Sequence, residues 1–265
     1  MRRSALLSVL LSTALCPALA VAAMKVEPVE WTVDGSAFSG YLVYDGDGTD
    51  ARPGLVMVPN WMGVNELAVE RARQIAGKEY VVLVADVYGA GIRPKNADEA
   101  AKAARGAYAD GGVSLRARAN EAVRVLKAQA GAAPLDPKRI GALGFCFGGS
   151  TVLELARSGS DIAGVVSFHG GLDSYLPASG NTIRTSVLVL NGADDASVSA
   201  ANIADFREEM RAAGADWQFV DFGGAVHCFT QPESDNPPNC VYDARASQRA
   251  FAMMRGFFTE RFAAE

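Results

Sequence analysis

The sequence predicts a single α/β domain with a mostly parallel central sheet and helices on both faces. The first indication is a series of short, continuous apolar runs, which are typical of strands buried on both faces. The second is that segments with apolar residues at helical spacing separate these runs, as in chains that cross over between parallel strands. The third is size, because 265 residues, 49% of them hydrophobic and 21% charged, suit one sizeable core.

The elements follow in order along the chain. Apolar and polar residues alternate around Asp34-Gly35-Ser36, which predicts an antiparallel hairpin of residues 29–33 and 38–44 at one edge of the sheet. The expected buried strands are residues 54–58, 80–85, 140–144, 162–168 and 187–190, with a last strand at 217–222. The expected helices are residues 66–77, 97–108, 115–130, 150–158, 200–213 and 244–262. The Pro- and Asn-rich stretch 234–239 predicts a surface loop within the domain.

Residues 1–23 have the pattern of an export signal. Two arginines precede a short apolar run at residues 5–11, and small residues follow. The run is shorter than the ~20 apolar residues that a membrane-spanning helix needs. We therefore expect cleavage near Ala20 or Ala23, a mature domain over residues 24–265, and a periplasmic or secreted protein. An uncleaved membrane anchor is the alternative.

Charge and motif content exclude several classes of partner. The net charge is -5 and the pI is about 5.2, and no cluster of Lys and Arg is interleaved with aromatics, so we expect no nucleic acid partner. Two histidines at unrelated positions, without clustered carboxylates, provide no metal ligand set. Residues 144–149 lack the Gly-x-Gly-x-x-Gly spacing of a dinucleotide site. We expect no cofactor, a small-molecule substrate, no membrane contact after signal removal, and a monomer.

A glycine-flanked cysteine follows one of the predicted strands. Residues 139–150 read RIGALGFCFGGS, in which glycines stand two residues before and two residues after Cys146. This spacing is that of a nucleophile elbow, where small neighbours let a strained turn present one side chain at its tip. The helix expected to follow would place its N-terminus at the sulfur, where backbone N–H groups favour a thiolate. The alternative is a buried structural cysteine in a glycine-rich turn.

Two other strand ends carry the residue types that would complete a catalytic site. Asp194 and Asp195 follow one strand, and His227 follows the last one. Because the carboxyl ends of parallel strands meet at one edge of the sheet, we expect these side chains to approach Cys146. A histidine can hold the thiol proton, and a carboxylate can fix the tautomer of that histidine. The pattern does not separate Asp194 from Asp195, and either could instead be a turn residue or a helix N-cap.

The order nucleophile, acid, histidine is that of the α/β-hydrolases. The other histidine of the chain, His169, also follows a strand, but it precedes the acid in sequence. We therefore interpret His169 as a hydrogen-bonded structural imidazole or a pocket-wall residue, and His227 as the general base.

Removal of the signal would leave three cysteines, an odd number, in an oxidising compartment. If Cys146 must stay free, Cys228 and Cys240 could pair across a short loop that contains three prolines. Two unpaired thiols are the alternative.

From about Val26 to the C-terminus the chain resembles the dienelactone hydrolase family of α/β-hydrolases. The matching motifs are Trp61-Met62-Gly63-Val64-Asn65, Ala85-Asp86-Val87-Tyr88-Gly89, Gly144-Phe145-Cys146-Phe147-Gly148-Gly149, Asn191-Gly192-Ala193-Asp194-Asp195 and Gly224-Ala225-Val226-His227-Cys228-Phe229. The resemblance implies the α/β-hydrolase fold and a triad of Cys146, His227 and Asp195, which stands three residues after the glycine. It further implies an oxyanion hole formed by the backbone N–H groups of Trp61 and Phe147.

The chain departs from the family at two positions. Members commonly carry a glutamate that contacts the resting thiol where this chain has Asn60, a residue that we expect to contact substrate. An amide cannot accept the thiol proton, so we expect His227 to activate Cys146 directly. An arginine that grips a substrate carboxylate in some members falls near Gln231, which carries no charge. Arg105 could substitute for it, and the alternative is that Arg105 lies on the solvated face of its helix.

These observations predict an exported hydrolase that cleaves a carboxylic ester or lactone through a thioester on Cys146. A non-catalytic ligand-binding protein on the same scaffold is the alternative, because fold does not fix function. A thiol-exchange protein is less consistent with the sequence, which has no Cys-x-x-Cys.

Overall fold

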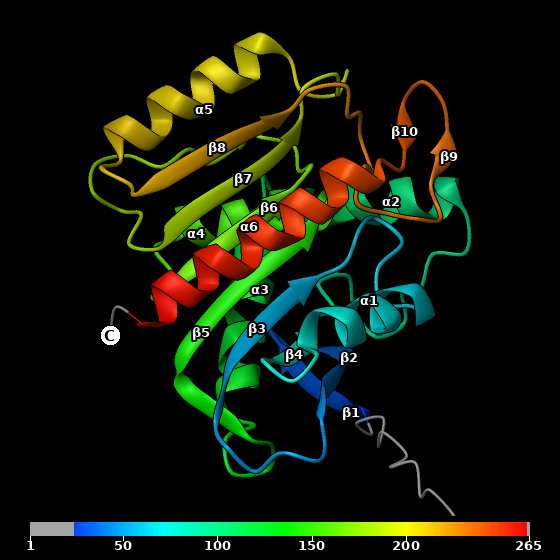
Figure 1. The fold of residues 1–265 in the computed structure, drawn as a ribbon, viewed down its shortest axis with the longest axis vertical. Coiled ribbons are helices and arrows are strands. Elements are labelled where there is room, and N and C mark those ends of the chain that lie inside the picture. Colours follow the sequence, from blue (N-terminus) through cyan, green and yellow to red (C-terminus); the bar gives the residue numbers. More distant parts are fainter. Residues whose placement is uncertain (1–23, 264–265) are drawn as a thin grey trace, which may run out of the picture.

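The computed structural model describes residues 24–263 and contains an eight-stranded central sheet (Figure 1). The strands are β1 (Met24–Val33), β2 (Ser36–Asp45), β3 (Arg52–Val58), β4 (Val81–Val84), β5 (Leu135–Phe145), β6 (Gly164–Phe168), β7 (Ser186–Gly192) and β8 (Trp217–Phe222). Their order across the sheet is β1-β2-β4-β3-β5-β6-β7-β8. The β1–β2 and β2–β4 pairs are antiparallel, and every other pair in this sheet is parallel. The predicted fold class and the predicted edge hairpin are confirmed.

Helices cover both faces of the sheet. Figure 1 shows α1 (Glu66–Ala76) and α6 (Ala244–Ala263) over the near face, with α3 (Val113–Lys127) and α4 (Phe147–Arg157) behind the sheet. Residues of α2 (Ala97–Ala107) and α5 (Ala200–Ala212) pack into the same core as α3 and α4. The helices thus bury two separate hydrophobic clusters, one on each face, which explains why the parallel strands are apolar without alternation.

Most expected and observed elements differ by a few residues at their ends; β1, for example, begins at Met24 and not at residue 29. The strand expected at 140–144 begins at Leu135, because a parallel pairing with β3 continues on the far side of a register shift at Pro53/Gly54. The expected loop at 234–239 does lie at the surface, with residues 235–239 exposed, but it also includes the short strand β9 (Asp235–Asn236), which pairs with β10 (Cys240–Val241). A disulfide from Cys240 to Cys228 and a hydrogen bond of 3.1 Å from the N–H of Val241 to the carbonyl oxygen of His227 join this segment to the loop after β8.

The fold brings the ends of three parallel strands to one edge. Cys146 follows β5, Asp195 lies just beyond β7, and His227 lies in the loop after β8.

The expected signal segment, residues 1–23, lies outside the described residues. Within the described part of the chain, none of the helices combines the length and the apolar character that a bilayer crossing requires.

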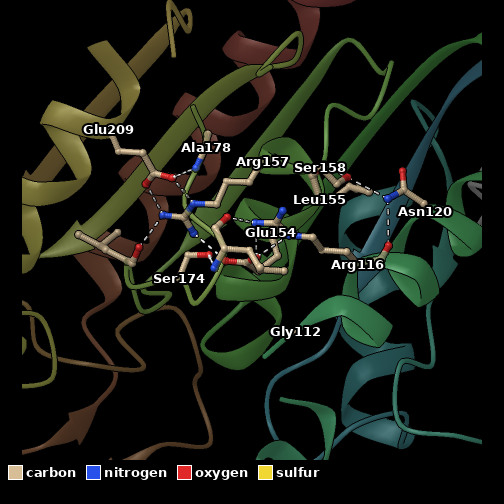
Figure 2. A network of polar contacts seen from close by, with 12 residues as sticks. Gly112, Arg116, Asn120, Glu154, Leu155, Arg157, Ser158, Ser174, Ala178 and Glu209 are labelled. Atoms are coloured by element: carbon tan, nitrogen blue, oxygen red, sulfur yellow. Dashed lines mark hydrogen bonds and ion pairs between the residues drawn. The ribbon is translucent and has the colours of Figure 1, made fainter. Parts of the chain in front are cut away.

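A buried ionic network lies behind the sheet, between α3, α4 and α5 (Figure 2). Glu154 accepts from Arg116 at 2.7 Å and from Arg157 at 3.0 Å, and Arg157 also pairs with Glu209 at 2.7 Å. The Glu154 and Arg157 side chains are only 2% and 1% exposed. The same network holds the segment after β6, because Glu209 accepts from the N–H of Ala178 and Arg157 donates to a carbonyl in that segment. Each buried charge therefore has an opposite charge beside it.

Arg157→Met should lower the free energy of unfolding by ~3–5 kcal/mol, because it leaves two carboxylates without their shared partner in a buried site. Arg211→Met is the matched control, since Arg211 and Glu208 form an exposed pair whose loss should cost less than ~1 kcal/mol. Urea denaturation of both variants measures the difference. Equal and small losses would show that the network contributes little to stability.

Candidate active site

Cys146 occupies a strained corner between β5 and α4. Its backbone has φ 54° and ψ -118°, a conformation that costs a non-glycine residue about 1–3 kcal/mol. Only glycine fits at the two flanking positions. A Cβ at Gly148 would overlap the carbonyl oxygen of Val58, and a Cβ at Gly144 would overlap the carbonyl oxygen of Gly148. The corner places Cys146 at the N-cap of α4, where the helix dipole favours a negatively charged sulfur.

His227 lies between Cys146 and Asp195. Its Nε2 is 3.0 Å from the sulfur of Cys146, and its Nδ1 is 2.7 Å from Oδ2 of Asp195. The other carboxylate oxygen of Asp195 accepts from Ser197, at 2.9 Å from the backbone N–H and 2.6 Å from the hydroxyl. Asp194 is exposed and makes no such contact with His227, so the geometry selects Asp195 from the two neighbours. This is the nucleophile, base and orienting acid arrangement of hydrolytic triads.

The contacts of His227 control its charge. Burial alone would lower the pKa of His227, but its hydrogen bonds to Asp195 and Cys146 raise that pKa to about 10. Burial would likewise raise the pKa of Asp195, but hydrogen bonds from His227 and Ser197 hold it below the ordinary value. At neutral pH His227 is therefore an imidazolium facing a carboxylate on one side and the sulfur on the other. The Nε2 of His227, at 3.0 Å from the sulfur, is within reach to exchange a proton with Cys146.

His169 is buried beside the corner. It is fully buried, its Nδ1 accepts from the backbone N–H of Cys146 at 3.2 Å, and its Nε2 is 2.8 Å from the hydroxyl of Thr230. Burial, with the charge of His227 as the second cause, places the pKa of His169 well below its usual range. The neutral ring then carries its proton on Nε2 and connects the nucleophile corner to the segment that follows His227. This geometry matches the structural role expected for His169.

Asn60 shapes the loop after β3 that faces the sulfur. Its Oδ1 accepts from the N–H of Met62 at 3.0 Å, and its carbonyl oxygen accepts from the N–H of Gly63 at 2.9 Å. Trp61 follows Asn60 in this loop, and its carbonyl oxygen accepts a hydrogen bond from the Tyr88 hydroxyl at 3.1 Å. The Tyr88 ring also lies 5.1 Å from the ring of Phe147, the first residue of α4. Phe147 has no intrahelical acceptor for its N–H, because the first helical amides never do.

A cavity of about 450 Å³ opens onto Cys146 and His227. Its lining is mainly apolar, with Trp61, Met62, Leu67 and Phe145 among the residues that form it. The Cys228–Cys240 disulfide is in its wall, whereas Cys146 is a free thiol. The pairing considered from the sequence is thus present.

The arginine in this cavity is not the one suggested by the sequence. Arg105 is exposed on α2 and does not line the cavity, whereas Arg71 of α1 does. Among residues 24–263, no group of three or more His, Cys, Asp or Glu side chains is placed to hold a metal ion.

A family model, "Dienelactone hydrolase family", matches residues 38–262. The chain belongs to the dienelactone hydrolase family. Membership covers nearly all of the described domain and makes the chain an ester hydrolase that acts on a small-molecule substrate.

Individual relatives agree with this assignment. The solved structure "m3DLH" is 37% identical, with a TM-score of 0.82 over 91% of this chain and 99% of that one. A dienelactone hydrolase-like promiscuous phosphotriesterase, P91, from metagenomic libraries is 36% identical, with a TM-score of 0.82 over 89% of this chain and 98% of that one. An uncharacterized Caenorhabditis elegans protein, K02A2.1, is 39% identical over 49% of this chain and 84% of its own length.

Sequence reasoning missed four residues around the site: Arg71, Tyr88, Ser197 and Thr230. Tyr88 lies within a motif quoted for the resemblance, and Ser197 stands two residues after Asp195, so local patterns could have indicated both. Arg71 and Thr230 are 159 positions apart, and only folding brings the guanidinium to the Thr230 carbonyl. No local pattern in the sequence marks that contact.

The two histidines should titrate very differently in the folded protein. In ¹H–¹³C NMR spectra, the Cε1 signal of His227 should shift with a midpoint near pH 10, while that of His169 should keep its neutral position from pH 6 upward. Asp195→Asn should move the His227 midpoint down, because it removes a hydrogen bond that favours the imidazolium. Asp194→Asn is the matched control and should leave the midpoint in place.

This titration also has a consequence for stability. An unfolded histidine has a pKa of about 6.5. The protonation of His227 therefore stabilises the fold fully below about pH 6.5, and this contribution is lost as the pH rises through about 10. A wild-type midpoint near 6.5 would contradict the charge assignment for His227.

Proposed function

We propose that this protein is an exported hydrolase that cleaves carboxylic esters or lactones through a thioester on Cys146. The observation that carries the proposal is the position of His227, within hydrogen-bonding distance of both the Cys146 sulfur and the Asp195 carboxylate. Family membership supports hydrolysis of an ester, and this geometry supports the covalent route.

In the first step the Cys146 thiolate attacks the carbonyl carbon of the substrate. A carbon–sulfur bond forms, and the carbonyl electrons move to the oxygen, which becomes an oxyanion. The backbone N–H groups of Trp61 and Phe147 are our candidates to stabilise that charge. Each such donor lowers the barrier by ~3 kcal/mol in other hydrolases. The strained corner at Cys146 holds the sulfur beside the first amide of α4 before substrate arrives.

The tetrahedral intermediate then collapses. The carbon–oxygen bond to the alcohol breaks, and the His227 imidazolium gives its Nε2 proton to the leaving oxygen. His227 is now neutral and takes a proton from a water molecule, which attacks the thioester. Expulsion of the sulfur restores the thiolate and releases the acid. Asp195 keeps the Nδ1 proton of His227 in place throughout, so that Nε2 always faces the reacting groups.

Asn60 contributes to the substrate-binding wall in this scheme. Both ends of its amide already have partners in the protein, since Oδ1 accepts from Met62 and Nδ2 donates to Gln231. The amide therefore fixes the loop that presents the Trp61 N–H and does not take the thiol proton. His227 is the group that contacts the sulfur, which supports direct activation of Cys146.

The export part of the proposal rests on the N-terminal sequence. The charged start, the short apolar run and the small residues at 18–23 support removal of a signal and delivery to the periplasm or medium. A disulfide in the folded domain agrees with an oxidising compartment. The mature chain is proposed to be a monomer that does not associate with membranes.

Cys146→Ala should abolish turnover of 4-nitrophenyl acetate, with a loss of at least ~10⁴-fold in kcat, because it removes the sulfur proposed to form the acyl intermediate. A stopped-flow time course of the wild type should show release of one equivalent of nitrophenol before the steady rate, and the variant should show neither phase. A wild type that binds esters without turnover would favour the alternative of a non-catalytic binding protein. Turnover that survives in Cys146→Ala would place the nucleophile elsewhere.

Expression of the full chain in a Gram-negative host should yield a periplasmic protein whose first residue is Val21 or Met24. N-terminal sequencing of the fractionated protein tests this. A variant with Leu7 and Leu10 changed to Asp should stay in the cytoplasm, because the apolar core of the signal is broken. An intact N-terminus on a membrane-bound wild-type product would instead identify an uncleaved anchor.

A further inference from the structure

The cavity beside Cys146 holds no uncompensated charge. Four titratable side chains line it: Cys146, His227, Arg71 and Glu233. The first two form the contact at the reaction centre, and the other two form an ion pair at 3.6 Å. The remaining lining residues are apolar or neutral polar groups. Beyond the reaction centre, the cavity lining therefore offers no unpaired charge to a substrate.

Arg71 is not free to receive an anionic substrate. Its guanidinium lies 5.3 Å from the ring centre of Phe145 and 5.9 Å from that of Phe251, and it donates to the carbonyl oxygen of Thr230. Its side chain is only 11% exposed, whereas that of Glu233 is 38% exposed. The only carboxylate in the cavity lining therefore already lies beside Arg71 and compensates its charge.

A neutral amide pair lies in the same wall. The Nδ2 of Asn60 donates to the Oε1 of Gln231, across 171 positions of sequence. Gln231 is buried, and Asn60 is held in turn by the N–H of Met62. Two amides that satisfy each other can offer a few hydrogen bonds to a substrate, but they cannot neutralise a charge.

We infer that the cavity selects esters whose acyl and alcohol parts are both uncharged, and that Gln231 is a specificity-determining residue for this choice. The inference rests on the proposed function and adds the substrate class. A carboxylate entering the cavity would lose its hydration without gaining a cation, because the one arginine in the lining is already paired with Glu233. Apolar alkyl or aryl groups have no charge hydration to lose, and they gain contacts with Trp61, Met62 and Leu67.

Two substrates of equal chain length test the inference: 4-nitrophenyl hexanoate and mono-4-nitrophenyl adipate, which carries a carboxylate at the far end. The wild type should prefer the hexanoate by at least ~10-fold in kcat/KM, after subtraction of the uncatalysed rate, since even one unpaired charge costs ~1.4 kcal/mol or more. A second pair, methyl 4-acetoxybenzoate and 4-acetoxybenzoate, places the charge in the alcohol part and should show the same preference.

Gln231→Arg should reduce or reverse the preference by at least ~10-fold, because it supplies a cation in the wall. Gln218→Arg, on the exposed side of β8 and outside the cavity lining, is the matched control and should keep the wild-type preference. Glu233→Gln is a second variant, which leaves the cavity wall otherwise intact and should raise the relative rate on the adipate, because it leaves Arg71 without its carboxylate partner.

The outcomes separate this inference from the proposed function. Equal rates on both esters in the wild type, all lost in Cys146→Ala, would overturn the inference and leave the proposed function standing. A wild-type preference that none of the cavity variants moves would also overturn the role of Gln231. Failure to hydrolyse any of the four esters would overturn both.

Discussion

The site depends on one close approach, that of α4 to the end of β3. The Cα of Gly148 lies so near the Val58 carbonyl that no side chain fits between them. This contact brings the first turn of α4 against the loop that begins at Asn60. The sulfur of Cys146 and the amides proposed to hold the oxyanion are therefore positioned by backbone packing, before any side chain of the triad is considered. The positive φ at Cys146 is the conformational cost of that arrangement.

Electrostatics at the reaction centre are set by placing two histidines in different surroundings. The ring centres of His169 and His227 are 5.2 Å apart, a distance at which two imidazolium charges would repel each other. The fold resolves this by burying His169 completely among neutral partners and by giving His227 the Asp195 carboxylate. One ring is thus a neutral acceptor for the Cys146 backbone, and the other carries the proton that the chemistry needs. Arg71 and Glu233 in the cavity follow the same principle, because each of these charged side chains is paired with the other.

The features that could be predicted from the sequence are those determined by residues close together in the chain. Short stretches of sequence are enough to indicate the buried strands, the crossover helices and the glycines around Cys146. The carboxyl ends of parallel strands meet at one edge of a sheet, which is why Cys146, Asp195 and His227 could be placed together. The contacts that shape the cavity are different in kind, because the Asn60–Gln231 bond and the Arg71–Thr230 bond join segments 171 and 159 positions apart. The stretch 234–239 lies at the surface as predicted, but the contacts that hold the segment also join positions distant in sequence. Its proline and asparagine content indicates irregular backbone, but its position is fixed by a disulfide and by main-chain bonds to the His227 loop.

The disulfide connects the proposed location of the protein to its proposed chemistry. Cys228 is the residue after His227, and Cys240 lies opposite His227 in an isolated β-bridge, so the bond closes the segment that carries Gln231 and Glu233. Cross-linking a loop of this kind reduces the number of conformations available to it. An oxidising compartment would therefore order the cavity wall while leaving Cys146, which has His227 as its partner, as the free thiol. Of the three cysteines in residues 24–265, two thus lie in the cavity wall as a disulfide, and the third is the one that we propose for the reaction.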